Sequence, residues 1–208
     1  MSAAQGDFST TEHDWHSQNY VEWWIARDAG GDAERRQRIR EMLAQSGFGP
    51  EAAITVLDVG GGYGVVTEEV VTAFPQARAC LQDYSEPMLA AARERLAQHR
   101  ERIRFIQADL RDPSWTDAVG GPFDLAVSAI AIHNLRDLSA IAACYRGIAQ
   151  VMKPDAVFLD YDLFDIAGGL ALHTRMLQEA GFARVDCLWQ QSPVATLAAY
   201  AAGTDVAG

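Results

Sequence analysis

The chain has 208 residues, 49% hydrophobic and 22% charged, which predicts one soluble globular domain and excludes two large ones. Its net charge of −11 disfavours a nucleic-acid substrate, because a phosphate backbone would be repelled on average. The absence of a run of about 18 apolar residues and of a secretory signal leads us to expect a cytoplasmic protein without membrane contacts, in which Cys80, Cys144 and Cys187 are reduced and buried.

Residues 1–50 are expected to form a helical extension ahead of the first strand. An aromatic segment from Trp15 to Trp24 has apolar residues at helical spacing, and a second helix ends near Gly47. The arginines of that second helix, beginning at Arg35, are interleaved with glutamates, so we expect them on a solvated face. The aromatic segment is predicted to be either a lid over a ligand site or a packing or homodimer surface.

From Ile54 onward the apolar pattern alternates between strands and helices. The first strand runs directly into a turn that contains Gly60, Gly61, Gly62 and Gly64, and glycine allows the backbone to approach a ligand closely. The strands are expected at residues 54–59, 77–82, 103–107, 123–128 and 156–161, with a closing antiparallel hairpin at 185–190 and 194–200. This pattern predicts a doubly wound α/β fold with a mostly parallel sheet and helices on both faces.

In such a sheet, ligands bind beyond the carboxyl ends of the strands. We expect this domain to span residues 51–202 and residues 203–208 to form a flexible tail. The loops that follow the first five strands are therefore predicted to share one site.

The spacing of the glycines decides which cofactor the turn fits. The dinucleotide fingerprint G-x-G-x-x-G fails, because Val65 or Thr67 stands where its third glycine is required. The observed spacing is D-x-G-x-G-x-G, from Asp58 to Gly64, and it resembles motif I of the class I S-adenosylmethionine-dependent methyltransferases. An acid before the turn suits a positively charged sulfonium cofactor better than a phosphate.

Further segments resemble the same family in the expected order along the chain. They are Asp83-Tyr84-Ser85-Glu86-Pro87-Met88-Leu89, Gln107-Ala108-Asp109-Leu110, Phe123-Asp124-Leu125, His133-Asn134-Leu135, Met152-Lys153-Pro154 and Ala180-Gly181-Phe182. The resemblance covers about residues 54–200 and implies a seven-stranded sheet of order 3-2-1-4-5-7-6, with the last strand antiparallel. It also implies S-adenosylmethionine as cofactor and S-adenosylhomocysteine as product.

Two departures from the family bear on the acceptor. Asp155-Ala156 stands where the family usually has two glycines, and the segment 162–169, which often carries substrate-binding elements, is short. The N-terminal extension is therefore expected to supply most of the substrate lid.

The resemblance and the strand ends together give a set of expected cofactor contacts. Tyr20 enters from the aromatic segment, where its ring and hydroxyl would reach the methionine end of the cofactor. The carboxylates of Asp83 and Asp109 are expected on the ribose hydroxyls and the adenine amino group. The full set is Tyr20, Asp58, Gly60, Gly62, Gly64, Asp83, Tyr84, Met88, Asp109, Leu110 and Ser128.

Methyl transfer requires alignment of nucleophile and methyl carbon and, for a protonated nucleophile, a base. His133 is the candidate base, because imidazole titrates near neutrality, and its alternative role is a structural hydrogen bond to backbone. Asn134 and Tyr161 are candidates for orienting the acceptor, or else for turn and sheet-edge roles. No cluster with metal-ligand spacing is present in the sequence, so no metal is expected.

The sequence thus favours methyl transfer to a small-molecule acceptor, at oxygen or nitrogen. One alternative is a protein that binds S-adenosylmethionine for a non-methyl reaction or as a regulatory partner subunit. An NAD-dependent oxidoreductase is disfavoured by the glycine spacing.

Overall fold

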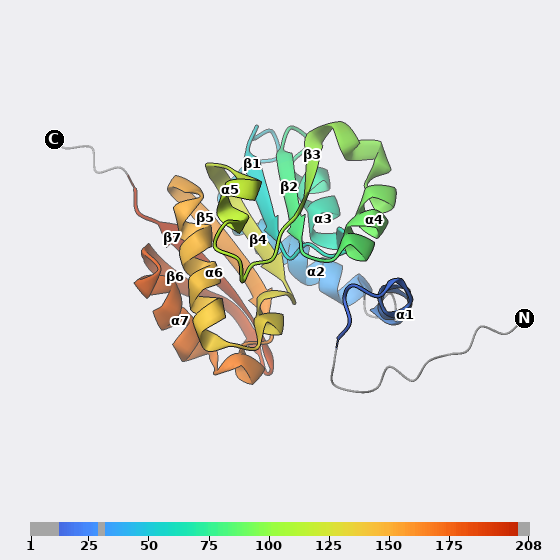
Figure 1. Ribbon diagram of the computed structural model, residues 1–208. Helices are drawn as coiled ribbons and strands as arrows, with labels where there is room; N and C mark the ends of the chain where they lie inside the picture. Colours follow the sequence, from blue (N-terminus) through green and yellow to red (C-terminus); the bar gives the residue numbers. More distant parts are fainter. Residues whose placement is uncertain (1–12, 29–31, 204–208) are drawn as a thin grey trace, which may run out of the picture.

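A computed structural model describes residues 13–28 and 32–203. The described residues form a seven-stranded sheet of order β3-β2-β1-β4-β5-β7-β6, which confirms the expected topology (Figure 1). The strands are β1 (Thr55–Val59), β2 (Arg78–Asp83), β3 (Ile103–Gln107), β4 (Phe123–Ala129), β5 (Met152–Asp162), β6 (Phe182–Gln191) and β7 (Val194–Ala201). Strands β1 to β5 pair in parallel, whereas β7 is antiparallel to both of its neighbours.

Helices cover both faces of this sheet (Figure 1). They are α1 (Gln18–Asp28), α2 (Asp32–Leu43), α3 (Val65–Ala73), α4 (Glu86–Arg95), α5 (Trp115–Val119), α6 (Leu138–Gln150) and α7 (Leu170–Glu179), with short 3-10 helices η2 (Ala97–Arg102), η3 (Ile132–Leu135) and η4 (Phe164–Ala167). One face packs on α1 to α4 through residues such as Val56 and Val127, and the other on α5 to α7 through Leu57 and Phe158. Neighbouring strand residues alternate between the two cores, as the pleat requires.

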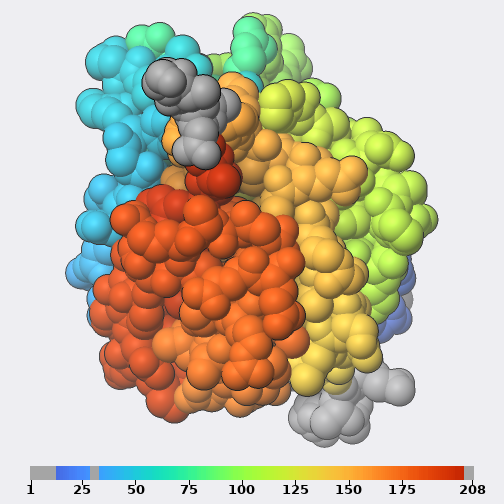
Figure 2. Space-filling model, turned by 90° about the vertical axis from the view of Figure 1, so that its left-hand side faces the viewer, coloured from blue at the N-terminus to red at the C-terminus, as the bar shows by residue number. Residues whose placement is uncertain are grey.

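The C-terminal elements form the end of the molecule that lies farthest from α1. Figure 2 looks onto this end, where the orange and red surface belongs to α7 and the β6–β7 hairpin. The carboxyl ends of β1 and β4 lie side by side, and their connections leave in opposite directions. This switch point is where a doubly wound sheet offers a ligand site.

The structure differs from the sequence predictions in three places. Strand β5 begins at Met152, so the expected turn at residues 153–155 lies within the strand, as an irregularity in its pairing with β4. Asp155 has φ 61 there, where the family usually has glycine. Helix α5 was not predicted, because five residues are too few to show a helical period. Cys187 is exposed, whereas Cys80 and Cys144 are buried as expected.

Among the described residues, no helix is both long and apolar enough to cross a membrane.

Candidate active site

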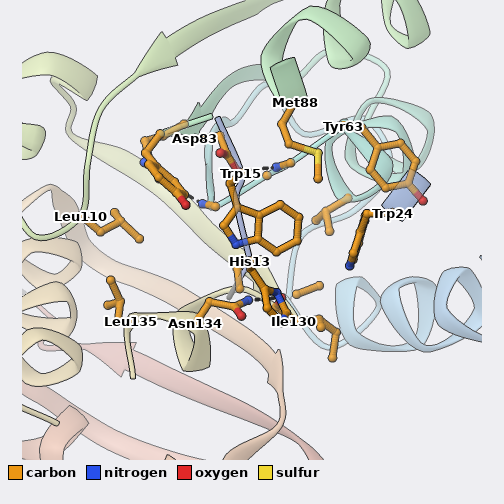
Figure 3. A pocket seen from close by; sticks show the side chains of 18 of the residues that line it. His13, Trp15, Trp24, Tyr63, Asp83, Met88, Leu110, Ile130, Asn134 and Leu135 are labelled. Atoms are coloured by element: carbon orange, nitrogen blue, oxygen red, sulfur yellow. Dashed lines mark hydrogen bonds between the residues drawn. The ribbon is translucent and has the colours of Figure 1, made fainter. Parts of the chain in front are cut away.

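A cavity of about 530 Å³ opens at the carboxyl ends of the strands. Its wall combines the segment before α1, the glycine turn after β1, and the ends of β2, β3 and β4 (Figure 3). The expected cofactor residues at this wall are Gly60, Gly62, Asp83, Tyr84, Met88, Asp109 and Leu110, and the expected acceptor residue is Asn134. The fold therefore brings together most of the side chains that the sequence nominated.

The glycine turn is held against β2 by its own backbone N–H groups. Gly60 donates to the side-chain oxygen of Gln82 over 3.0 Å, and Gly61 donates to the carbonyl oxygen of Gln82 over 2.9 Å. Gly60 has φ +64, and an added Cβ would stand 2.6 Å from the Cβ of Ala131. Glycine is required at this position by both its conformation and its contact with the loop after β4.

Asp83 links the glycine turn to the start of α4. Its carboxylate accepts the backbone N–H of Gly62 over 2.9 Å and that of Ser85 over 2.8 Å. Burial raises the pKa of Asp83, while the hydrogen bonds from Ser85 and Gly62 act in the opposite direction. Ser85 in turn caps α4 by accepting the N–H of Met88. The result is a pre-oriented carboxylate at the cavity wall.

Asp58 lies behind the glycine turn and is not a residue of the cavity wall. The carboxyl is 1% exposed and accepts the hydroxyl hydrogen of Thr67 over 2.6 Å. Burial raises the pKa of Asp58 to about 7. An added Cβ on Gly61 would meet the Asp58 carboxyl at 2.8 Å, so this acid supports the turn from beneath.

The opposite end of the cavity, at the ends of β3 and β4, is apolar with a charged rim. Leu110 and Leu135 lie on this side in Figure 3. Asp109 is half exposed and accepts the backbone N–H of Arg111 over 2.9 Å. This end of the cavity thus combines two apolar side chains with one carboxylate.

Aromatic residues from the N-terminal segment cover the cavity. Trp15 packs edge-on against Tyr20 and Trp24, with ring centroids 5.2 and 5.4 Å apart, and its backbone carbonyl accepts the hydroxyl of Ser85. In Figure 3 the Trp15 indole lies across the cavity between Asp83 and the loop that carries Asn134. The segment is thereby attached to the loop that carries Asp83.

Besides Asp58 and His133, four of the nominated residues lie away from the cavity wall. Tyr20 is buried behind Trp15, and Ser128 is buried in β4. Gly64 starts α3, where a Cβ would meet Leu96 at 2.8 Å. Tyr161 packs against Trp189 of β6. Their nominated roles as direct contacts therefore stay predictions.

His133 also lies outside the cavity wall, beside a residue that lines it. Its Nδ1 is 2.5 Å from a carboxylate oxygen of Asp162, and its backbone N–H donates to the other oxygen over 2.9 Å. Asn134, the next residue, lines the cavity and donates to the carbonyl of Ile130 over 3.4 Å (Figure 3). The loop after β4 is thus fixed to the end of β5.

Several wall residues were not nominated from the sequence. They are His13, Asp14, Arg35, Arg111, Arg136 and the short apolar run Ala129-Ile130-Ala131. Burial, followed by Arg136 and His133, lowers the pKa of His13. The spacing of the glycines gives no information on these residues, because they come from segments far from the turn in sequence.

The prediction of a solvated arginine face on α2 was wrong for Arg35. This guanidinium lines the cavity, pairs with Asp28 over 2.5 Å and donates to the hydroxyl of Tyr63 over 2.8 Å. Arg36 also faces inward and pairs with Glu68 and Glu69 of α3. Alternating charges did not reveal which side of α2 packs on the domain.

Within the described part of the chain, no three His, Cys, Asp or Glu side chains converge as metal ligands would.

Part of the chain that builds this cavity resembles a known protein family. Residues 56–155, from β1 into β5, match a family model described as a methyltransferase domain. The chain carries the domain of a class I S-adenosylmethionine-dependent methyltransferase. This methyltransferase domain contains the glycine turn, Asp83 and Asp109.

Curated relatives of the methyltransferase domain differ in what their names say they act on. The chain is 43% identical over 90 residues to the release factor glutamine methyltransferase of Chlorobaculum tepidum, which covers 42% of this chain and 31% of that protein. It is 48% identical over 141 residues to the trans-aconitate 2-methyltransferase of Variovorax paradoxus, which covers 65% of this chain and 51% of that protein. Across such relatives the chain spans between 26% and 51% of their length.

Solved structures support the fold. An O-methyltransferase family protein from Burkholderia thailandensis superposes with a TM-score of 0.75 at 17% identity, over 91% of this chain and 62% of that one. At such identity the similarity concerns the fold alone.

The cofactor of this class is S-adenosylmethionine, and the residues of the cavity fit it. A Cβ on Gly62 would meet only the Met88 sulfur, at 3.9 Å, so the turn leaves its backbone open to the cavity. Asp83 offers a carboxylate suited to ribose hydroxyls, and the apolar end beside Leu110 and Leu135 suits an adenine ring.

Proposed function

We propose that the chain transfers a methyl group from S-adenosylmethionine to an oxygen or nitrogen atom of a small-molecule acceptor. The observation that carries this proposal is a single cavity that combines the glycine turn and Asp83 with Trp15 and Asn134. The glycine turn and Asp83 bind the cofactor, and Trp15 and Asn134 border the acceptor. The cavity of about 530 Å³ lies within the size range of small-molecule sites, roughly 300–1,000 Å³.

In this proposal the cofactor supplies an activated methyl group on a sulfonium sulfur. Asp83 holds the ribose, the backbone of Gly60 and Gly62 adjoins the methionine portion, and Asp109 with Leu110 binds the adenine. Tyr84 and Met88 also border the cofactor, whereas Asp58, Gly64 and Ser128 act through the turn and the sheet. The chain's own task is to align the acceptor and to exclude water, because in-line displacement is sensitive to small errors in position.

The N-terminal extension, residues 1–50, completes the site in this proposal. Trp15 and Trp24 cover the cavity, and Tyr20 supports them from behind. Methyltransferase activity then needs both this extension and the domain of residues 51–202. The covered cavity favours a small acceptor over a protein or nucleic acid, although the relatives include methyltransferases named for both kinds of acceptor.

The net charge of −11 agrees with a cytoplasmic enzyme that acts without nucleic acid. The aromatic segment covers the cavity of its own chain, so the proposal does not require a homodimer.

Two measurements test this function. Isothermal titration calorimetry should show binding of S-adenosylhomocysteine and no binding of NAD, because the turn lacks the dinucleotide glycine spacing. Mass spectrometry should detect a 14-dalton mass increase in at least one member of a panel of phenols, amines and carboxylic acids that includes trans-aconitate. NAD binding in place of S-adenosylhomocysteine would reject the cofactor assignment. Cofactor binding without any methylated product would favour a binding or regulatory role.

A further inference from the structure

Strand β5 ends with two buried carboxyl groups on one face. Asp160 and Asp162 are two residues apart, so both side chains point toward α6 and α7. Their exposed fractions are 0% and 2%. Two like charges cannot both be buried this close without a large cost, so their hydrogen bonds should tell which one is ionised.

Asp162 has the partners of an ionised carboxylate. It accepts the backbone N–H of His133 over 2.9 Å and that of Leu163 over 2.8 Å. The Nδ1 atom of His133 approaches it to 2.5 Å. Both carboxylate oxygens are therefore occupied by donors, which favours the charged form.

Asp160 has the partners of a protonated acid. One oxygen contacts the hydroxyl of Tyr145 at 3.3 Å, and the other has no hydrogen-bond partner among the described residues. Burial, followed by the charge of Asp162, raises the pKa of Asp160 well above its usual value. Asp160 is therefore the protonated member of the pair, and Asp162 is the ionised one.

The hydrogen-bond directions beyond Tyr145 agree with this assignment. His173 must donate from Nε2 to the carbonyl of Ala167, 2.9 Å away, because a carbonyl only accepts. Burial lowers the pKa of His173, so its Nδ1 is an acceptor for the hydroxyl hydrogen of Tyr145, 2.7 Å away. With its only hydrogen used there, the Tyr145 oxygen can accept the proton of Asp160.

The same arrangement selects the tautomer that His133 has when its ring is neutral. Asp162 holds Nδ1, which therefore carries the proton, and Nε2 is the basic nitrogen. Among the described residues Nε2 has no hydrogen-bond partner, and the side chain is 11% exposed. Asn134, next in sequence, and His13, whose pKa His133 influences, both line the cavity. His133 therefore adjoins the cavity through Asn134, with Nε2 left without a partner among the described residues.

We propose that Asp162 is the positioning residue that holds His133 as the general base, and that the acceptor is a hydroxyl or an amine rather than a carboxylate. A carboxylate is already ionised at neutral pH and needs no base, whereas a hydroxyl or an amine must lose a proton. This inference rests on the proposed function, because it names the acceptor class of the same site.

The acceptor oxygen or nitrogen forms a bond to the methyl carbon, and the methyl–sulfur bond breaks with its electron pair remaining on sulfur. The acceptor proton moves to Nε2 of His133, and the carboxylate of Asp162 stabilises the imidazolium that results. Water later removes the proton from His133 and restores the base.

The first test needs no acceptor and no cofactor. Nitrogen-15 NMR of the full-length protein, recorded at a pH at which the imidazole is neutral, should show the His133 proton on Nδ1 in the wild type and in Asp160→Asn. In Asp162→Asn this tautomer should be lost, because the carboxylate that selects it is gone. A wild-type proton on Nε2, or an unchanged tautomer in Asp162→Asn, would overturn the pairing irrespective of the proposed function.

The second test compares two isosteric changes on the same strand. With methyl-labelled S-adenosylmethionine and the best acceptor of the phenol and amine panel, Asp162→Asn and His133→Gln should lower kcat about 10²- to 10⁴-fold. KM should stay within threefold. Asp160→Asn should keep kcat within threefold, because an amide imitates a protonated carboxyl. Calorimetry with S-adenosylhomocysteine confirms that each variant is folded.

The outcomes distinguish a failure of the Asp162–His133 pairing from a failure of the proposed function. Equal losses in Asp160→Asn and Asp162→Asn would overturn the positioning role of Asp162. Methylation of trans-aconitate at a rate independent of His133 would overturn the acceptor class. If wild-type protein binds S-adenosylhomocysteine but labels no acceptor, the proposed function itself is rejected, and the NMR result still decides the pairing.

Discussion

The two halves of the cavity are built from different kinds of contact. The proposed cofactor half, around Gly60 to Gly62 and Asp83, is fixed by hydrogen bonds that the backbone N–H groups of the glycine turn donate to Gln82 and Asp83 of β2. The acceptor half, around Trp15 and Asn134, is fixed by ring packing and by one carboxylate at the end of β5. Hydrogen bonds to β2 restrict the glycine turn to one geometry, whereas ring contacts let the second half change with little effect on the fold.

The largest effect, a loss of folding stability, is expected from a substitution at Gly60, where the two halves touch. Gly60→Ala should destabilise the protein by about 1–2 kcal/mol for the positive φ and about 1–3 kcal/mol more for the clash with Ala131. Gly47→Ala is the matched control, because Gly47 also has positive φ but no atom within 4 Å of an added Cβ. Urea unfolding measures both variants. Equal losses of stability would show that contact between the halves contributes nothing.

A smaller effect, measured on cofactor binding, is expected from a change at the centre of the cofactor half. Asp83→Ala should weaken S-adenosylhomocysteine binding about 100-fold, because hydrogen bonds to a charged group contribute about 1.5–3 kcal/mol. The control is Asp112→Ala, a carboxylate outside the cavity that bonds Ser114. Calorimetry measures both variants. An affinity within threefold of wild type in Asp83→Ala would remove this residue from the ribose site.

The smallest effect is expected in the acceptor half. Trp15→Ala should weaken S-adenosylhomocysteine binding about tenfold, since each lost ring pair contributes about 0.5–1.5 kcal/mol. Its melting temperature should change little, because the side chain is only partly buried. Trp189→Ala removes the same side chain on β6, away from the cavity, and should leave binding unchanged. Identical behaviour of the two variants would contradict a covering role for Trp15.

The same contrast explains how far the sequence could predict this molecule. The strands and the closing hairpin were predicted and confirmed, because alternating apolar runs and turn residues are local signals. The sheet order, which the family resemblance implied, was also confirmed. Asp83 and Asp109 were placed at the ligand side for the same reason, since each follows a strand. Their contacts with the cofactor stay a prediction.

The acceptor half left much weaker signals. Asp162 and His133 are 29 residues apart, and no period in the sequence links them. Arg35 looked like one charge among several on α2, because interleaved charges do not show which side of a helix packs. Asp58 was expected at the cofactor, but strand alternation turned its side chain toward Thr67 beneath the turn. Such outcomes depend on tertiary packing rather than on local pattern.

Ser85 has a consequence for how the cofactor enters and leaves. Its hydroxyl oxygen accepts the N–H of Met88, while its hydrogen goes to the carbonyl of Trp15. If the N-terminal segment moved away, as the proposed lid role requires, this hydrogen would turn to water and the cap of α4 would stay intact. Release of a spent cofactor would then not require any part of the sheet or of α4 to unfold.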